Sequence, residues 1–374
     1  MVAARPRTIV LSAGELSGDM HAAHVVAAMR AAIPAATVVG MAGDRSAAAG
    51  MEIRFHHRDY AVIGFTGVLA GLPRFVRLER AMRRMIDRAD LFVPVDYPGL
   101  NLRLCAHARA RGVPVLYYIS PQIWAWGAGR MTKIRATVDR MAVVLPFETA
   151  LYRDAGVDAE FVGHPFVVDH ELPDPVPPAQ RAHVALLPGS RASEVRHMLP
   201  LLVATAESLA ARVPGTRFVV ARSPAVDPEL YRALTDGSAL DLTIDADAVS
   251  VLARARAAVV ASGTATLQAA LLETPLVIVY RTTPLNYALA RRLVTIPHVG
   301  LVNVLLGERV APEFVQDAAR PDAIAAEVQT LLQNGDARSA MLERFRTLRR
   351  QLGGGRGARR VAEMAAELVA RSPA

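Results

Sequence analysis

Two acidic residues of this chain directly follow short apolar runs, where a carboxylate could move a proton. Asp96 ends the run LFVPVD (91–96), and the strand-breaking Pro98 and Gly99 come next. A carboxylate at the carboxyl end of a buried parallel strand lies at the mouth of a site, where it can accept the proton of a substrate hydroxyl. An aspartate before a proline turn can also serve the turn alone, by bonding its own backbone. We predict a general base at Asp96, with Glu15 as the reserve candidate.

The turn AGELSGDMHAA (13–23), which contains Glu15, has the composition of a ligand-binding helix N-terminus. Gly14 allows close approach of the backbone, and free N–H groups at such a position favour anionic or hydroxyl-rich ligands. The spacing is not the G-x-G-x-x-G of dinucleotide-binding proteins. Ser17 or Asp19 could instead cap the helix, so both interpretations stay open.

Two turns in the second half of the chain could hold a diphosphate. In ALLPGSRASEV (185–195), Gly189, Ser190 and Arg191 stand between an apolar run and a helical pattern. Backbone N–H groups and a guanidinium would hold the anion there. The segment VVASGTATLQAALLETP (259–275) repeats the arrangement with three further residues: Ser262, Gly263 and Thr264. Neither turn has the Gly-Lys-Ser/Thr of a P-loop, so ATP hydrolysis is not predicted.

Two short sequences match metal-binding motifs, but each has a simpler structural explanation. Asp245 and Asp247 form a D-x-D sequence, but they precede a helical pattern, where aspartate caps the helix. His56 and His57 lie in a polar connection without further ligands at metal spacing, and we expect them at the surface. No metal site is predicted.

The elements that must position these residues are short apolar runs alternating with helical patterns such as 19–32 and 74–89. We expect strands at 8–13, 37–42, 91–96, 113–119, 141–146, 183–189, 217–222, 257–262 and 275–280. This alternation is typical of parallel sheets covered by helices on both faces. The fold class is therefore α/β, with two Rossmann-like domains whose parallel sheets face a central cleft.

A proline-rich segment separates the two runs of strands. ELPDPVPPAQ (171–180) has four prolines in ten residues, and we expect neither helix nor strand to cross it. The predicted domains are 1–170 and 181–352. In the C-terminal segment 353–374, the glycine-rich GGGRG (353–357) separates a last helix, 358–371, from the second domain.

Composition excludes several classes of protein. The chain has 374 residues, a net charge of +8 and one cysteine, Cys105, so no disulfide within the chain is possible and a reducing cytosol is expected. No apolar stretch reaches the roughly 18 residues of a spanning helix, and the first apolar run is too short for a signal peptide. Arginines are not interleaved with aromatic residues as in nucleic-acid-binding motifs, so we expect no nucleic-acid partner.

Both tryptophans of the chain stand beside its one lysine. SPQIWAWGAGRMTKI (120–134) contains Trp124, Trp126, Arg130 and Lys133. The pair could be core, a sugar platform or a membrane contact, and we expect one ring to be buried and one exposed.

Several stretches together resemble the lipid-A-disaccharide synthases, glycosyltransferases of the GT-B fold. They occur in the family's order across nearly the whole chain: AGELSGD (13–19), VDYPGLNLRL (95–104), YYISPQIWAW (117–126), VDRMAVVLPFE (138–148), FVGHP (161–165), LLPGSR (186–191), ASGTATLQAALLETP (261–275) and LARRLVTIPHVGLVNVLLGERVAPEFVQ (289–316). The resemblance implies transfer of 2,3-diacylglucosamine from its UDP derivative to 2,3-diacylglucosamine 1-phosphate (lipid X), with inversion and without metal or cofactor. The products would be UDP and the tetraacyl disaccharide 1-phosphate, an intermediate of lipid A and lipopolysaccharide.

The resemblance also assigns residues to each role. It implies three catalytic residues: Asp96, Glu15 and Arg191. It implies a donor site in the second domain, formed by Gly189, Ser190, Arg191, Ser262, Gly263, Thr264, Gln268, Asn303 and Glu313. The acceptor and membrane residues, in the first domain, would be Gly14, Ser17, Asp19, Phe65, Trp124, Trp126, Arg130 and Lys133. The family usually has Glu where this chain has Gln268 and Gly67. The neutral amide of Gln268 could still bond ribose hydroxyls, whereas any role of the acid at position 67 is absent or moved.

Because both substrates carry acyl chains, we expect a cytoplasmic enzyme peripherally bound to anionic phospholipid of the inner membrane. Segments 61–76 and 120–135 would form the apolar and basic contact. Assembly into a homo-oligomer stays open. The alternatives are another GT-B enzyme of UDP-N-acetylglucosamine (a 2-epimerase or the peptidoglycan N-acetylglucosaminyltransferase) or a non-catalytic binding module.

Overall fold

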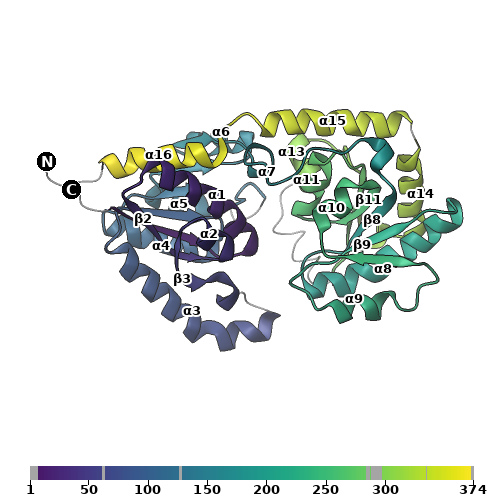
Figure 1. The fold of residues 1–374 in the computed structure, drawn as a ribbon, viewed down its shortest axis with the longest axis horizontal. Helices are drawn as coiled ribbons and strands as arrows, with labels where there is room; N and C mark the ends of the chain where they lie inside the picture. The colour runs from purple at the N-terminus through teal and green to yellow at the C-terminus, as the bar shows by residue number, and fades with distance from the viewer. Residues whose placement is uncertain are drawn as a thin grey trace. The chain divides into compact units, whose positions relative to one another are not determined.

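The computed structural model describes residues 7–60, 64–125, 129–283, 287, 297–333 and 335–371, without the side chains of residues 64–72. The chain forms two compact units. Residues 1–169 and 352–374 make the first unit, and residues 170–351 make the second. Each contains a parallel sheet with helices packed around it (Figure 1), as predicted for two Rossmann-like domains.

The sheet of the first unit has the strand order β3-β2-β1-β4-β5-β6-β7. Its strands are β1 (Arg7–Ala13), β2 (Ala36–Ala42), β3 (Glu52–His56), β4 (Leu91–Val95), β5 (Leu116–Tyr118), β6 (Arg140–Val143) and β7 (Ala159–Phe161). Its helices are α1 (Leu16–Ala32), α2 (Asp44–Ala48), α3 (Gly64–Ile86), α4 (Pro98–Ala110), α5 (Arg130–Thr137), α6 (Pro146–Asp154), α7 (Pro165–Val168) and α16 (Gly357–Arg371). Every residue of β4 is buried, which explains its uninterrupted apolar sequence.

The sheet of the second unit has the order β10-β9-β8-β11-β12-β13. Its strands are β8 (His183–Leu187), β9 (Phe218–Ala221), β10 (Leu242–Asp245), β11 (Ala255–Ala261), β12 (Leu276–Tyr280) and β13 (Glu313–Val315). The helices are α8 (Ala192–Arg212), α9 (Pro228–Thr235), α10 (Ala248–Ala253), α11 (Thr264–Leu271), α13 (Leu301–Leu306), α14 (Pro321–Leu332) and α15 (Asp336–Leu352). The sequence did not predict β3, β7, β10 and β13, which are the edge strands of the two sheets.

The strand order places one switch point in each sheet. The chain moves outward from β1 to β3 and then returns to the other side of β1 with β4; β8 and β11 repeat this arrangement. Ligands of open α/β sheets bind outside the carboxyl ends of the strands at such points. These are the ends where Asp96 and Arg191 were predicted to act.

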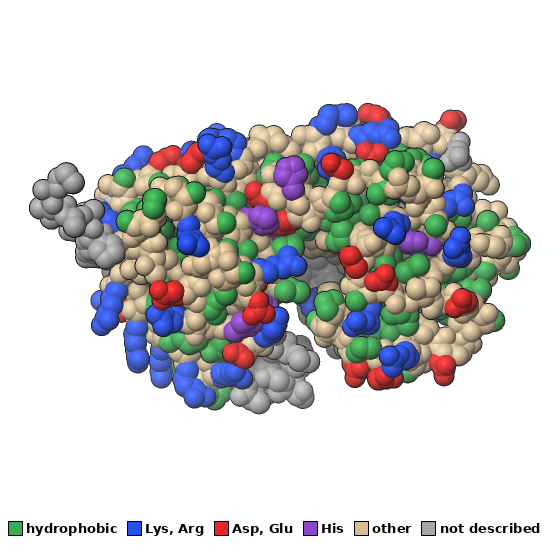
Figure 2. Space-filling view, in the orientation of Figure 1, with side chains coloured by type: hydrophobic (Ala, Val, Ile, Leu, Met, Phe, Trp, Pro, Cys, Tyr) green, Lys and Arg blue, Asp and Glu red, His purple; other side chains and the backbone are tan. Residues whose placement is uncertain are grey.

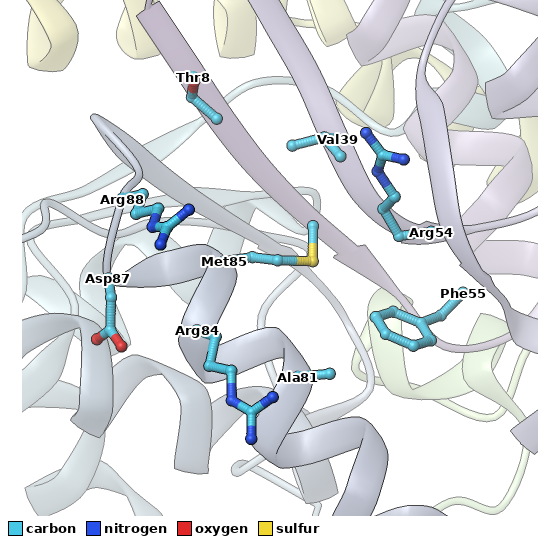
Figure 3. Close-up of a pocket in the computed structure, with 9 residues that line it drawn as sticks. All are labelled: Thr8, Val39, Arg54, Phe55, Ala81, Arg84, Met85, Asp87 and Arg88. Carbon is cyan, nitrogen blue, oxygen red and sulfur yellow. The ribbon is translucent and has the colours of Figure 1, made fainter.

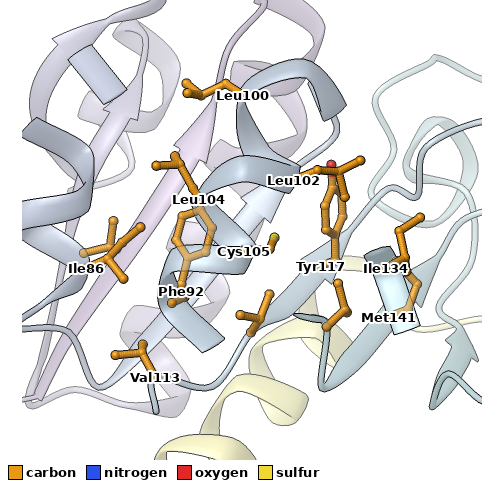
Figure 4. Close-up of a cluster of buried hydrophobic side chains, with 14 of the residues drawn as sticks. Ile86, Phe92, Leu100, Leu102, Leu104, Cys105, Val113, Tyr117, Ile134 and Met141 are labelled. Atoms are coloured by element: carbon orange, nitrogen blue, oxygen red, sulfur yellow. The ribbon is translucent and has the colours of Figure 1, made fainter. Parts of the chain in front are cut away.

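The core of the first unit lies between its sheet and the helices that include α4 and α5. Phe92, Leu104 and Tyr117 pack there with Ile134 (Figure 4). Cys105 is buried in the same cluster, and burial raises the pKa of its thiol, so it is a packing residue.

The C-terminal helix α16 belongs to the first unit, where it packs against α1. Arg360 bonds both carboxylate oxygens of Glu160 at 2.5 and 2.8 Å, and Arg140 bonds Glu367 at 2.5 Å. The glycine-rich segment before α16 is required by close packing, since a Cβ on Gly355 would lie 2.0 Å from the carbonyl oxygen of Val162. These contacts attach α16 firmly.

The proline-rich segment is held to the second unit by Arg181, which is buried. Its guanidinium donates to the carbonyl oxygens of Val176, Ala255 and Leu272 and to Oγ1 of Thr274, at 2.8 to 3.3 Å. A buried charge is tolerated where its donors are satisfied in this way. Much of the segment therefore has a defined place on its unit.

Candidate functional site

The turn after β4 has an unusual backbone. Asp96 and Tyr97 have φ of 46° and 49°, in the left-handed region that few residues other than glycine adopt. The turn is held at the Asp96 peptide: its N–H donates to the carbonyl of Tyr118 at 3.0 Å. Its carbonyl accepts the Tyr117 hydroxyl at 2.8 Å and the Asn101 amide at 2.7 Å. Backbone strain retained by so many bonds is typical of functional sites.

The surroundings of Asp96 prepare its carboxyl group for acid–base chemistry. Burial, and then the charge of Glu15, raise its pKa from 3.8 to about 6, against smaller opposing effects of the Tyr97 N–H and His21. Glu15 is exposed and stands at the start of α1. The structure thus brings together the two predicted acids, and Asp96 has the pKa of a base that works near neutral pH.

The glycine-rich turn after β1 has a packing function in addition to the predicted ligand-binding one. A Cβ on Gly14 would lie 2.3 Å from the ring of Tyr97, so only glycine fits between β1 and the Asp96 turn. Ser17 is exposed, as a ligand contact would require.

Asp19 is buried and has a structural function. Its carboxylate accepts the backbone N–H groups of Gly43, Arg45 and Ser46 at 2.8 to 3.1 Å, at the start of α2. The sequence analysis left open whether Asp19 caps its own helix, α1. In the structure, Asp19 instead bonds the N-terminus of the next helix, α2. Nearby His57 is also buried, which corrects the expectation that it lies at the surface.

The aromatic segment is partly described. Trp124 is half-buried, and its ring meets the edge of Phe147 with centroids 5.3 Å apart. Its indole N–H donates to Glu148 at 3.0 Å, a partner that the sequence analysis did not identify. Arg130 and Lys133 lie on α5, half-buried. Trp126 and the side chain of Phe65 lie outside the described residues.

The turn between β8 and α8 already binds a carboxylate of its own chain. Oε2 of Glu194 accepts the N–H groups of Ser190 and Arg191 at 2.9 and 3.2 Å, and its other oxygen meets the Arg191 guanidinium at 3.1 Å. Gly189, at φ 108°, leaves the room for this, because a Cβ would lie 2.6 Å from that carboxylate. The turn has the geometry of an anion site, and the Arg191 side chain is 73% exposed.

The turn between β11 and α11 presents its backbone to solvent. Gly263 and Thr264 are exposed at the helix start, and Gln268 is half-buried one turn further on. The sequence predicted Ser262 as a diphosphate ligand, whereas in this structure its hydroxyl donates to the carbonyl of Val299 at 2.5 Å. It thereby fixes the segment before α13.

Asn303 and Glu313 form one hydrogen-bonded cluster. The Asn303 amide nitrogen donates to Glu313 at 2.8 Å and to the carbonyl of Ala311 at 2.7 Å, and its oxygen accepts the Ala311 N–H at 2.9 Å. Glu313 also accepts the N–H groups of Val299 and Gly300 at 3.1 and 2.9 Å. In this structure the pair shapes the loop before α13, so contact with a donor sugar would have to use the remaining lone pairs.

The Asp245–Asp247 sequence has a structural role at a helix start. Asp247 caps α10 by accepting the Ser250 N–H at 3.0 Å, as the sequence indicated. Within the described part of the chain, no three His, Cys, Asp or Glu residues are grouped to hold a metal ion. No helix among the described residues is both long and apolar enough to cross a bilayer.

Comparison with known proteins agrees with these features. A family profile described as lipid-A-disaccharide synthetase matches residues 9–369. The lipid-A-disaccharide synthase of Trichlorobacter lovleyi is 41% identical over 100% of both chains. That of Myxococcus xanthus is 41% identical over 97% of this chain and 98% of its own.

Solved structures show the same fold at low sequence identity. CalG4, the calicheamicin glycosyltransferase, superposes with a TM-score of 0.61 at 18% identity, over 99% of this chain and 100% of its own. The structure of S. aureus MnaA with UDP superposes with a TM-score of 0.65 at 11% identity, over 98% and 99%. This likeness establishes the GT-B fold, and the full-length sequence matches establish more: the chain belongs to the lipid-A-disaccharide synthase family.

Proposed function

We propose that the protein transfers 2,3-diacylglucosamine from its UDP derivative to the 6-hydroxyl of 2,3-diacylglucosamine 1-phosphate, with inversion and without a metal ion. The observation that carries the proposal is Asp96: a strained, hydrogen-bonded turn at a switch point presents a carboxyl group whose pKa is about 6. Family membership supports the substrate pair. The first unit takes the acceptor, and the second holds the UDP-sugar.

Asp96 acts as the general base. As the acceptor oxygen forms its bond to the anomeric carbon, its proton passes to the Asp96 carboxylate, and the bond from that carbon to UDP breaks with its electron pair leaving on the diphosphate. Direct displacement from the opposite face inverts the anomeric configuration. The neighbouring Glu15 keeps the pKa of Asp96 high enough for effective proton transfer.

Arg191 stabilises the departing diphosphate. Its exposed guanidinium and the adjacent N–H groups hold a carboxylate in this structure, which supports an anion-binding role for the turn. The donor diphosphate replaces Glu194 on these groups. Because negative charge grows as UDP leaves, this contact contributes more to the transition state than to ground-state binding.

The membrane partner is an anionic phospholipid surface. The described half of α3 carries a row of exposed arginines spaced to lie along the helix: Arg74, Arg77, Arg80, Arg84 and Arg88, the last just beyond its end. Figure 2 shows blue side chains along this part of the first unit. Such a row suits lipid phosphates, and it adds to the basic residues of α5.

A cavity of about 710 Å³ adjoins this row (Figure 3). Phe55 and Met85 supply apolar lining, and the charged lining is formed by Arg54, Arg84, Arg88 and one acidic residue, Asp87. The cavity also reaches the first residues of β1, away from the carboxyl ends where Asp96 lies, so it is no reaction site. Its lining suits an acyl chain beside a phosphate, which supports peripheral binding.

The decisive experiment is an assay of UDP release. Purified protein is incubated with UDP-2,3-diacylglucosamine and lipid X in excess EDTA, and the lipid product is identified by mass spectrometry. We expect UDP and a tetraacyl disaccharide 1-phosphate in equal amounts. Transfer that disappears with chelator and returns with magnesium would refute the metal-free mechanism, and release of UDP without lipid X would refute the transfer.

A further inference from the structure

Glu148 is a buried carboxylate that the proposed chemistry does not use. It is the third residue of α6 and is 1% exposed. One oxygen accepts the Ser120 hydroxyl at 2.7 Å and the Trp124 indole N–H at 3.0 Å; the other accepts the Leu145 N–H at 3.3 Å. Negative charge is favoured at a helix N-terminus, which offsets part of the cost of burying this carboxyl group. One side chain thus joins α6 to two residues of the loop after β5.

That loop begins with a strained residue. Ile119 has φ of 60°, a conformation that a β-branched side chain adopts only when the surroundings impose it. Its N–H is bonded to Ala142 at 3.1 Å, and the next residue, Ser120, is bonded to Glu148. Tyr152 of α6 adds a bond to the Pro121 carbonyl at 2.9 Å. Helix α6 therefore holds the loop in place through side chains.

The loop lies beside the candidate base. Strand β5 pairs with β4 through Tyr118 and Val95, and the Asp96 N–H donates to the Tyr118 carbonyl. The two strained turns therefore follow neighbouring strands at the same edge of the sheet. The charge of Asp96 also raises the pKa of Glu148, as the smallest of the influences on that group.

The ring that Glu148 anchors belongs to an apolar surface. Trp124 packs edge-on against Phe147, the residue before Glu148, and Phe147 is 39% exposed. An indole with its polar N–H fixed inward offers its remaining atoms to apolar contacts. An acceptor that carries acyl chains is the substrate that would use such a surface.

We propose that Glu148 is a positioning residue for the transfer reaction, which holds Ser120 and Trp124 so that the loop after β5 is ordered beside Asp96 for the lipid acceptor. This inference rests on the proposed function, because the acceptor is the substrate that the loop would meet. The carboxyl group touches no reacting atom, and its effect passes through the loop.

The first test measures the contact itself by tryptophan fluorescence. In a Trp126→Phe background only Trp124 emits. Glu148→Ala should shift its emission to longer wavelength and increase quenching by acrylamide at least about twofold, because the ring loses its anchor. Burial raises the pKa of Glu148 from 4.5 to about 7, against the bonds from Ser120 and Trp124, and the nearby titratable groups are Asp96 and Tyr152. In the Trp126→Phe protein, Trp124 emission should therefore change with pH around pH 7. The same protein with Glu148→Gln added should lack this transition.

The second test asks whether the contact matters for the reaction. With both tryptophans present, Glu148→Ala should raise KM for lipid X at least about fivefold and leave KM for the UDP-sugar within about twofold. Ser120→Ala is a milder change that should also raise KM for lipid X. It replaces Glu148→Ala as the test if that variant does not fold. Glu160→Gln is the matched control: it removes a carboxylate paired with Arg360 in the same unit and should leave both KM values unchanged.

Unchanged Trp124 emission in Glu148→Ala would overturn the inference that Glu148 holds the Trp124 ring in place. A changed emission with no selective rise in the acceptor KM, or an equal rise in Glu160→Gln, would overturn the role in the reaction. If the parent transfers no sugar at all, the proposed function fails together with that role, whereas the emission result still decides whether Glu148 holds the loop.

Discussion

Replacing Asp96 by Asn should strongly impair catalysis and stabilise the protein at the same time. Asparagine tolerates the left-handed backbone of residue 96, and its side chain has a similar shape, so the turn should be retained. Loss of a general base lowers turnover by about 100-fold or more. UDP binding should be intact, since the proposed donor residues lie in the other unit.

The gain in stability follows from the pKa of Asp96. Its pKa is raised from 3.8 to about 6 on folding, a difference that corresponds to about 3 kcal/mol. Because the folded state binds the proton more tightly, this contribution is complete below pH 3.8 and is lost as pH rises through about 6. Asparagine never ionises. The variant should therefore unfold at higher temperature than the parent at pH 8, and the difference should shrink towards pH 4.

Two measurements test this reasoning. UDP release from pH 5 to 8 should rise through an apparent pKa of about 6 in the parent. Calorimetry of both proteins at several pH values gives the change in stability. Near-normal turnover of Asp96→Asn would remove the assignment of the base, and an equal or lower unfolding temperature at pH 8 would refute the electrostatic argument even if activity is lost.

Three further outcomes are expected. Arg191→Lys should stay strongly impaired in turnover with a smaller change in UDP affinity, because the charge remains but the two-pronged geometry is lost; equal losses in both, by kinetics and calorimetric titration, would contradict this. Glu15→Gln should move the acid limb of the activity profile below that of the parent, since removing the Glu15 charge lowers the pKa of Asp96; an unmoved limb would show that the two acids do not interact. Replacing Arg84 and Arg88 together by Gln should weaken flotation with anionic but not zwitterionic liposomes, and equal flotation of variant and parent would leave the arginine row without a membrane role.

The sequence predicted the central strands well because burial on both faces leaves a simple signal. β4 and β12 are almost entirely buried and read as continuous apolar runs. The four strands that were missed lie at sheet edges, and none is fully buried: the short β10 alternates between partly buried and exposed residues. An edge strand needs only one neighbour and carries polar side chains, so its sequence resembles that of a loop.

The candidate site residues could be named from the sequence, but their hydrogen-bonding partners could not. Asp96 could be named because it ends a recognisable strand, whereas the contacts that raise its pKa come from residues distant in the sequence. Glu148 left only a faint signal, a glutamate in the first turn of a helix that begins with Pro146. Nothing local indicates that its oxygens would reach Ser120 and Trp124, because that contact depends on how β5 and β6 pair.

The place of α16 has a consequence for biosynthesis. The second unit is one continuous stretch of chain, but the first unit needs residues 352–374, which are made only after the whole second unit. Although its sheet is made first, the first unit cannot complete the packing of α1 until α16 has been synthesised, so the second unit can complete its fold earlier. Until then, the nascent first unit exposes an apolar helix face, and chaperones that bind such faces should find their target there.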